Sequence, residues 1–415
     1  MAQKGIAGSL RMLRYRWWAF FYARCLSGMP WFWPARPPGV PAMVAARRMI
    51  RRHFGRDHHP AYRVLAKLFS AIVWLPAVLI QFWELRYFHE PDAVPIKRAP
   101  GALWAAVRHN VLPGDYYGFA LWQPERKLNI DSYLYSIEGP RLLKLLNRPV
   151  QPNPIDDKLA FHEMCKVHSL PSPKILAAFA PSGKLLEFET NRPPKCDLFV
   201  KPRIGSGGDG TERFRWLGGL FESSCGCALS HEELNGYLAS RARIENRTLL
   251  VQPALSNHPA LRISPNAPLA SVRLVTGLAT DGIVLPIWGL IYFPKNEQIP
   301  ARYMSVALID MESGRLMSRP QEMWGAKRSS HQLNNSDFPC MLPDWQIARQ
   351  IVKLAHFACS DFAFVGWDVA FTVRGPIILE GNAHWSASEY QRLRGEPLGH
   401  TKFADILAMW LPDSS

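Results

Sequence analysis

The sequence predicts an α+β protein preceded by a basic, aromatic helical segment. Residues 156–170 repeat apolar side chains at helical spacing, which predicts an amphipathic helix. Apolar runs at 198–201, 249–251 and 271–276, and two runs that flank the turn at 372–375, have the length and composition of strands. The chain has 415 residues, 48% of them hydrophobic, which indicates two to three folded domains with a real core.

Positive charge is concentrated at the start of the chain. Residues 1–100 hold 16 Lys and Arg against 4 Asp and Glu, a net charge of 16 − 4 = +12 out of +15 for the whole chain. Two interpretations stay open: a surface helix at an anionic membrane leaflet, or a solvated basic face with its tryptophans packed inward. Nucleic acid is an unlikely partner because no recognisable binding module accompanies the charge. The segment holds six of the fifteen tryptophans: Trp17, Trp18, Trp31, Trp33, Trp74 and Trp83.

The longest apolar run of this segment, residues 68–82, has fifteen residues with Pro76 in the middle. A bilayer-spanning helix needs about 20. The run fits a buried core helix, an interfacial or re-entrant membrane segment, or a true span. We see no ordinary signal peptide, and the seven scattered cysteines favour a reduced, cytosolic environment.

A glycine-rich loop follows the strand at 198–201. The strand ends in Lys201, and four of the six residues at 205–210 are glycine. Glycines let backbone N–H groups approach an anion closely, and a lysine ammonium adds a positive charge. The pattern therefore predicts a phosphate-binding loop, although it matches neither the P-loop nor the dinucleotide-binding motif. Taken alone, such a loop is an ordinary surface turn more often than a nucleotide site, so the turn stays open as the alternative.

An acidic hairpin near the C-terminus is the strongest signal for chemistry. A hairpin centred on Arg374 places Asp368 opposite Glu380, and Asn382 shares a face with Glu380 because alternate strand residues point the same way. Two facing carboxylates repel unless a cation lies between them. Two carboxylates and an amide are oxygen donors that suit Mg²⁺. The alternative, an exposed hairpin with solvated acids, fits poorly with the apolar flanks Phe364, Val365, Ile377, Ile378 and Leu379.

Two further features lie between the loop and the hairpin. The strand at 249–251 stops at Gln252-Pro253, where its backbone could meet the edge of an adenine. Arg273 lies within an alternating strand, and a half-buried arginine usually has a fixed anion as partner. That anion is a phosphate or a carboxylate, and a purely structural ion pair is the alternative.

The order of these motifs resembles the ATP-grasp superfamily. The segments VKPRIGSGGDG, SVRLVTG and GWDVAFTVRGPIILEGNAHW are similar to the sugar-transfer-associated ATP-grasp group found with polysaccharide genes. The resemblance covers about residues 156–392, and its most specific part is the Asp…Glu-x-Asn set.

The resemblance implies an ATP-grasp fold with ATP and Mg²⁺ between two α+β lobes. In that family Lys158 and Lys201 would contact phosphates, and Arg273 would stabilise the γ-phosphoryl group during transfer; Arg273 and Lys201 are the expected catalytic residues. Asp368, Glu380 and Asn382 would bind Mg²⁺. The residues expected to hold the nucleotide through the loop and the adenine edge are Gly205, Ser206, Gly207, Gly208, Gln252, Pro253, Ala254 and Leu255.

The implied organisation has four parts: a basic segment at 1–100, a short region at 101–155, a small lobe at 156–255 and a large lobe at 256–415. The usual family reaction is an ATP-dependent ligation in which a carboxylate becomes an acyl phosphate and an amine then attacks it. We expect a small-molecule or saccharide-linked acceptor in polysaccharide or cell-envelope biosynthesis. The alternatives are a kinase with a hydroxyl acceptor and a non-catalytic, membrane-associated nucleotide-binding scaffold.

The location expected from these features is the cytoplasm, with residues 1–90 holding the protein peripherally at an anionic inner membrane surface. His384, Trp385 and Glu389 follow the metal set and are candidates to face the acceptor.

Overall fold

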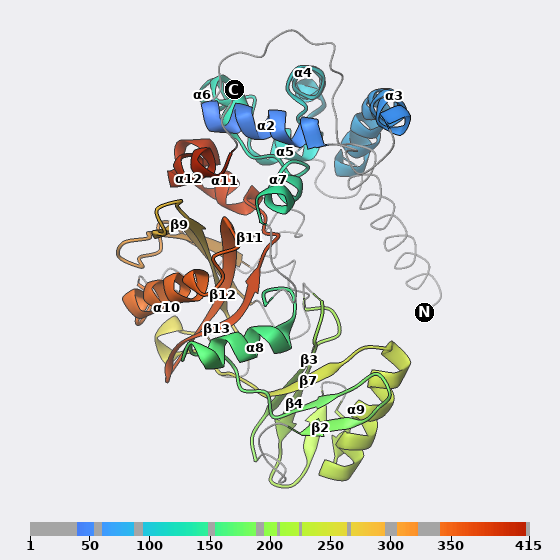
Figure 1. The fold of residues 1–415 in the computed structure, drawn as a ribbon, viewed down its shortest axis with the longest axis vertical. Coiled ribbons are helices and arrows are strands. Elements are labelled where there is room, and N and C mark those ends of the chain that lie inside the picture. The colour runs from blue at the N-terminus through green and yellow to red at the C-terminus, as the bar shows by residue number, and fades with distance from the viewer. Residues whose placement is uncertain are drawn as a thin grey trace. The chain divides into compact units, whose positions relative to one another are not determined.

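The computed structural model describes residues 40–53, 60–86, 94–147, 154–187, 195–205, 208–223, 226–263, 267–294, 305–322 and 341–411. Within these residues the chain forms two compact units (Figure 1). One comprises the residues up to Leu146 and from His384 onward, and the other those from Asn147 to Ala383. The expected surface helix around Trp17 and Trp18 lies outside the described residues.

The first unit is helical and is built from both ends of the chain. Helix α12 near the C-terminus packs against α2 near the N-terminus, and α11 packs against α5. Tyr116, Phe119, Tyr133 and Tyr135 lie in its aromatic core. The helices are α2 (Pro41–His53), α3 (Pro60–Glu84), α4 (Ala99–His109), α5 (Pro113–Gly118), α6 (Pro124–Leu128), α7 (Gly139–Leu146), α11 (Ser388–Arg394) and α12 (Lys402–Trp410), with 3₁₀ turns at Ile96–Arg98, Ile130–Ser132 and Leu398–His400.

Gln391 of α11 joins the two chain ends of this unit. Its side chain is fully buried. Its Oε1 accepts hydrogen bonds from the Leu134 N–H (3.0 Å) and the Leu398 N–H (2.9 Å), and its Nε2 donates to the Leu134 carbonyl (2.8 Å). One buried amide therefore satisfies three backbone groups that would otherwise be unpaired.

Helix α3 contains the apolar run at 68–82 and continues through Pro76. One face is buried: Trp74, Ala77 and Val78 pack in the unit, and the Trp74 indole N–H donates to the Ala106 carbonyl at 3.0 Å. A core helix was one of the expected structures for this run, and the buried face agrees with it. Among the described residues, no helix has both the length and the apolar character that a membrane crossing requires.

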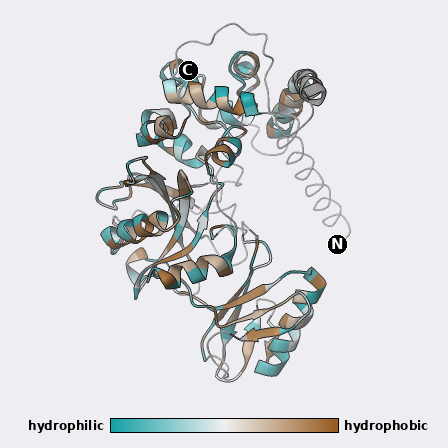
Figure 2. Cartoon of the chain, in the orientation of Figure 1, coloured by the Kyte–Doolittle hydropathy of each residue, from teal (hydrophilic) through white to brown (hydrophobic). Residues whose placement is uncertain are grey.

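The second unit contains two antiparallel sheets, which confirms the α+β fold class. The first sheet has seven strands in the order β2-β1-β7-β3-β4-β5-β6, and α9 (His231–Glu245) packs Leu234, Leu238 and Ala242 against it. Figure 2 shows that its strands are largely hydrophobic, whereas α9 carries many hydrophilic residues. The strands are β1 (Ala177–Phe179), β2 (Leu185–Glu187), β3 (Leu198–Pro202), β4 (Glu212–Trp216), β5 (Phe221–Ser223), β6 (Ala228–Leu229) and β7 (Leu249–Pro253).

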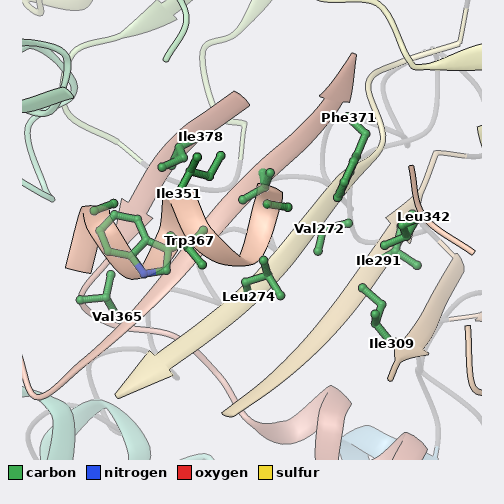
Figure 3. Packing of buried hydrophobic residues seen from close by; sticks show 14 of the residues in the cluster. Val272, Leu274, Ile291, Ile309, Leu342, Ile351, Val365, Trp367, Phe371 and Ile378 are labelled. Carbon is green, nitrogen blue, oxygen red and sulfur yellow. The ribbon is translucent and has the colours of Figure 1, made fainter. Parts of the chain in front are cut away.

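The second sheet has six strands in the order β11-β10-β9-β8-β12-β13, and α8 (Lys158–Val167) and α10 (Trp345–Phe357) pack on it. Figure 3 shows Ile351 of α10 beside Trp367 of β12 and Ile378 of β13 in the core of this lobe. The 3₁₀ turn Pro259–Leu261 precedes the sheet in the chain. The strands are β8 (Ser271–Leu278), β9 (Val284–Phe293), β10 (Ser305–Ile309), β11 (Gln321–Glu322), β12 (Phe364–Thr372) and β13 (Gly375–Asn382).

A buried polar chain lies beneath the hairpin β12–β13. The Trp367 indole N–H donates to Thr276 Oγ1 (2.8 Å), and Thr276 Oγ1 lies 2.6 Å from His356 Nδ1. His356 Nε2 lies 2.8 Å from the Phe362 carbonyl, which can only accept, so Nε2 carries the proton and Nδ1 accepts from Thr276. Burial lowers the pKa of His356 to about 4, although the hydrogen bond to Phe362 opposes the shift. The imidazole is therefore neutral at pH 7.

Candidate active site

The start of α8 is tied to the strand that carries the glycine loop. Asp157 caps the helix by accepting hydrogen bonds from the Leu159 N–H (2.9 Å) and the Ala160 N–H (3.4 Å), and it forms an ion pair with Arg203 (Nη2–Oδ2 2.6 Å). Burial alone would raise the pKa of Asp157, but the hydrogen bonds from Arg203 and the backbone lower it below its usual value. The Lys158 N–H also donates to the Arg203 carbonyl (3.2 Å). These contacts fix Lys158 next to the loop.

Lys158 joins the loop to the acidic hairpin. Its ammonium donates to the Gly205 carbonyl at 2.6 Å and lies 3.5 Å from Glu380 Oε2. The side chain is largely buried. The glycine loop, the N-terminus of α8 and strand β13 therefore meet at one ammonium group.

Lys201 is a buried lysine whose surroundings shift its pKa. It is 8% exposed near the end of β3, and no described residue forms a hydrogen bond or an ion pair with its ammonium. Burial lowers its pKa to about 8; Glu380 and Asp368 raise the pKa, and Lys158 lowers it further. A buried ammonium without a paired anion is costly, and a bound anion would offset that cost.

The hairpin brings the two predicted carboxylates together. Asp368 on β12 lies directly opposite Glu380 on β13, and Asn382 lies opposite Gly366, which confirms the predicted pairing of Asp368 with Glu380. The turn that leads to this register is shorter than the expected turn at residues 372–375. The turn holds only Val373 and Arg374, with Thr372 paired to Gly375.

A β-bulge restores the expected pairing. Val369 pairs with Ile378, and Asp368 pairs with Glu380, so Leu379 is the extra residue. Leu379 is only partly buried, whereas the expected core neighbours Ile377 and Ile378 are buried. The bulge sits immediately beside the acidic pair.

Arg273 of β8 holds Asp368. Arg273 Nε lies 2.5 Å from Asp368 Oδ1 and Nη2 lies 3.0 Å from Oδ2, a bidentate pair. Burial would lower the pKa of Arg273, but the charge of Asp368 raises it above its usual value. Asn382 Nδ2 donates to Asp368 Oδ2 at 3.2 Å. The anion expected beside Arg273 is therefore a carboxylate in this structure.

The charges at this place do not cancel. Burial raises the pKa of Glu380, and the negative charge of Asp368 raises it further, while Lys158, Lys201 and Arg273 oppose the shift. The three cations and two carboxylates leave 3 − 2 = +1. Shifted pKa values of grouped buried charges are typical of functional sites. Among the described residues, no group of three or more His, Cys, Asp or Glu side chains could hold a metal ion. The predicted set consists of two carboxylates and an amide.

The segment expected to meet adenine already uses part of its polar groups. Gln252 is buried, and its Nε2 lies 3.5 Å from the Pro173 carbonyl. The Ala254 N–H donates to the Asp197 carbonyl at 2.8 Å, and Pro253 has no N–H to offer. In the described part of the chain only the Leu255 N–H of this segment has no hydrogen-bond partner.

The predicted loop residues are described in part. Gly205 (φ 147°) and Gly208 (φ 73°) have positive φ angles, which glycine adopts without strain. Thr211 Oγ1 donates to the Gly208 carbonyl at 2.8 Å and steadies the far side of the loop. Ser206 and Gly207 lie outside the described residues. His384, Trp385 and Glu389 belong to the helical unit, where Trp385 is buried against Phe403.

Sequence reasoning missed the pair Asp157–Arg203. An aspartate directly before an apolar-periodic run is a helix N-cap signal, and this signal identifies Asp157. Arg203 carries no comparable signal, because its partner comes from a segment 46 residues earlier in the chain.

Two antiparallel sheets with a lysine-bearing strand, a glycine loop and an acidic hairpin define an ATP-grasp protein. The chain belongs to the sugar-transfer associated ATP-grasp family, whose model matches residues 140–403. A search of the curated proteins gave no match.

Three solved structures are among those that match parts of the chain. The L-amino acid ligase of Bacillus licheniformis is 12% identical, with 61% of this chain and 47% of that chain covered and a TM-score of 0.33. Carboxyaminoimidazole ribonucleotide synthase of Aspergillus clavatus, complexed with ATP, is 11% identical over 63% and 53% (TM-score 0.32). The D-alanine–D-alanine ligase of Helicobacter pylori is 14% identical over 68% and 71% (TM-score 0.36). The chain thus spans about half the length of the first two.

Proposed function

We propose that this protein is an ATP- and Mg²⁺-dependent ligase that joins a carboxylate to an amine. The observation that carries the proposal is Lys201, a buried ammonium without a described partner beside two facing carboxylates. Triphosphate supplies the missing negative charge, and charge neutralisation with positioning is most of what phosphoryl transfer requires.

The donor set fits Mg²⁺. Asp368, Glu380 and Asn382 come from paired positions of one hairpin, and the mutual repulsion of the carboxylates is relieved by a cation. In this structure the Asn382 side-chain amide donates an N–H to Asp368. Rotation of the amide group by 180° would direct its oxygen to a bound cation instead. When bound, Mg²⁺ would neutralise charge on the phosphate oxygens.

The residues of the chain would act in the following way. Lys201 and Lys158 would hold the phosphates, and the backbone around Gly205–Gly208 would cover them. The Leu255 N–H, with its neighbours Gln252, Pro253 and Ala254, would meet adenine. Arg273 would leave Asp368 and stabilise the γ-phosphoryl group.

The chemistry balances as follows. An oxygen of the substrate carboxylate bonds to the γ-phosphorus while the bond to ADP breaks, which gives an acyl phosphate. The amine then bonds to the acyl carbon, phosphate leaves and the amine loses a proton. The products are an amide, ADP and one inorganic phosphate. The family description, sugar-transfer associated ATP-grasp, supports a saccharide-linked substrate.

A nucleotide-binding assay tests this proposal without knowledge of the substrate. Mg·ATP and Mg·ADP should raise the melting temperature of the protein, because a ligand that binds only the folded state stabilises it. Lys201→Met should abolish the rise, and Lys166→Met, at an exposed lysine of α8, should keep it. Equal shifts in both variants would remove Lys201 from the site.

The acceptor class needs a second assay. A ligase releases one phosphate per ADP only when both an acid and an amine are present. An ATP-grasp kinase keeps the same residues and transfers the phosphate to a hydroxyl, so ADP forms without free phosphate. A non-catalytic scaffold consumes no ATP with any envelope extract.

A further inference from the structure

The exposed face of α3 is apolar along nearly half of the helix. Ile72 (73% exposed), Leu75 (44%), Leu79 (48%), Ile80 (54%) and Trp83 (54%) follow the spacing of one helix face. Single exposed apolar residues are ordinary, whereas an ordered row of large ones marks an interaction surface. We call these five residues the α3 stripe.

The charge around the stripe identifies the kind of partner. Residues 1–146, which run through the helical unit and the segment before it, hold 21 Lys and Arg and 8 Asp and Glu, a net of 21 − 8 = +13 out of +15. Of the eight acids, Asp115 and Asp131 are buried and Glu138 is paired with Arg47. Among the described residues of this part, one acid, Glu125, is exposed against five basic side chains, Arg48, Arg52, Lys97, Lys127 and Lys144.

This charge disfavours two occupants from the same chain. A second copy of the chain would place the net charge of +13 on its residues 1–146 against the same charge on the first copy, and like charges repel. Residues 1–39 hold six Lys and Arg and no Asp or Glu, so their net charge would oppose binding to this surface. An anionic surface gains from the same charge, and an apolar row needs an apolar partner at the same place.

We propose that the α3 stripe inserts into the headgroup and upper acyl region of an anionic lipid bilayer, with α3 lying in the membrane plane. From Ile72 to Trp83 the stripe is about 16 Å long at 1.5 Å per residue, roughly half of a 30 Å hydrocarbon core. Trp83, close to the end of the helix, suits the headgroup level. Exposed basic side chains of the same unit, among them Arg48, Arg52 and Lys97, add attraction to anionic headgroups.

Vesicle sedimentation with the full chain tests this proposal. The wild-type protein should sediment with vesicles that contain phosphatidylglycerol, bind at least tenfold less to pure phosphatidylcholine, and lose binding at high salt. The double variant Ile72→Glu/Ile80→Glu should lose at least tenfold in binding to the anionic vesicles. Ile244→Glu, at an 82% exposed position of α9 in the other unit, should bind like wild type.

Circular dichroism shows whether each variant is folded, and Leu79→Gln gives a milder second variant that should weaken binding in the same direction. Equal sedimentation of wild type and both stripe variants overturns the proposal. So does a wild-type dimer in size-exclusion chromatography that the stripe variants convert to monomer. Binding to duplex DNA that competes fully with vesicles also overturns it.

Discussion

At the residue scale, the ion pair between Arg273 and Asp368 restricts what each side chain can bind. Both side chains are largely buried, and the bidentate contact occupies both carboxylate oxygens of Asp368. A cation that binds Asp368 must therefore compete with the guanidinium. A phosphate that draws Arg273 away frees the carboxylate at the same moment. Metal and nucleotide binding should consequently favour each other through this pair.

This competition predicts an unusual effect of Arg273→Met. Without nucleotide, Mn²⁺ should bind about tenfold more tightly than to wild type, while Mg·ATP should bind more weakly. Electron paramagnetic resonance of free Mn²⁺ measures the first quantity and calorimetry the second. Arg374→Met, at an exposed arginine in the turn of the same hairpin, is the matched control and should change neither. Unchanged Mn²⁺ affinity in Arg273→Met would show that the ion pair does not restrict the metal.

The pKa of Lys201 predicts how nucleotide affinity depends on pH. Its pKa is lowered to about 8, so the ammonium loses its proton as the pH rises through 8 and the attraction for phosphate is lost. The affinity of wild-type protein for ADP should fall by up to about tenfold per pH unit above 8. Lys201→Arg keeps its charge and should show a flat profile from pH 7 to 9.5 in calorimetric titrations. A parallel decline in both proteins would assign the pH dependence to another group.

At the element scale, the hairpin β12–β13 shows which structural features the sequence predicts and which it does not. The alternation of residues predicts that Glu380 and Asn382 share a face, and a hairpin centre at Arg374 predicts Asp368 opposite Glu380. The pairing is confirmed, but the two-residue turn and the bulge at Leu379 could not be read from the sequence. Turn length and bulge compensate each other, and both depend on packing with the rest of the sheet.

Gly381, between the proposed metal-binding residues Glu380 and Asn382, has no room for a side chain. A Cβ at this position would lie 3.0 Å from Trp367 Cζ3 and 3.2 Å from Ile155 Cγ2, both in the core. We expect Gly381→Ala to lower the free energy of unfolding by about 1–3 kcal/mol. It should also weaken nucleotide binding, because Glu380 and Asn382 move with the strand.

The matched control for Gly381→Ala is Gly236→Ala. Gly236 lies in the middle of α9, and a Cβ there meets nothing within 4 Å. This substitution should stabilise the protein by about 0.5–1 kcal/mol. Urea unfolding of both variants measures the difference, and a destabilisation of equal size in both would exclude the steric explanation.

His356 couples the stability of the large lobe to pH. Its pKa is about 4 in the folded protein and near 6.5 in the unfolded chain, so the unfolded state binds more protons between these values. The stability that the neutral imidazole contributes is fully present above pH 6.5 and is lost as the pH falls toward 4. The difference corresponds to roughly 3 kcal/mol.

A variant isolates this contribution. His356→Gln should be less stable than wild type at pH 7.5 but should lose less stability between pH 7.5 and pH 5, as measured by urea unfolding. His400→Gln, at an exposed histidine, should follow the wild-type slope. A slope in His356→Gln equal to that of wild type would assign the acid sensitivity to other groups.

At the scale of the whole molecule, the assembly of the helical unit lies beyond what periodicity or motifs can predict. The sequence motifs indicate the lobes and the candidate ligands because these depend on local order along the chain. The packing of α2 against α12 joins segments 402 − 53 = 349 or more residues apart, and the hydrogen bonds between Leu134 and Gln391 span 257 residues. No local pattern marks these contacts, because the sequence around Gln391 is that of an ordinary helix.

That assembly predicts the effect of Gln391→Ala. The substitution leaves the Leu134 N–H, the Leu134 carbonyl and the Leu398 N–H unpaired in a buried place, which should cost about 2–4 kcal/mol. Because the chain forms two compact units, the loss should lower only the unfolding transition of the helical unit. Hydrogen exchange should then accelerate in α7, α11 and α12 and stay unchanged in α9. Gln350→Ala, at an exposed glutamine of α10, should leave both transitions within about 0.5 kcal/mol of wild type. Uniform acceleration of exchange in both units would mean that the protein unfolds as one cooperative body, and the helical unit would then have no separate stability for Gln391 to support.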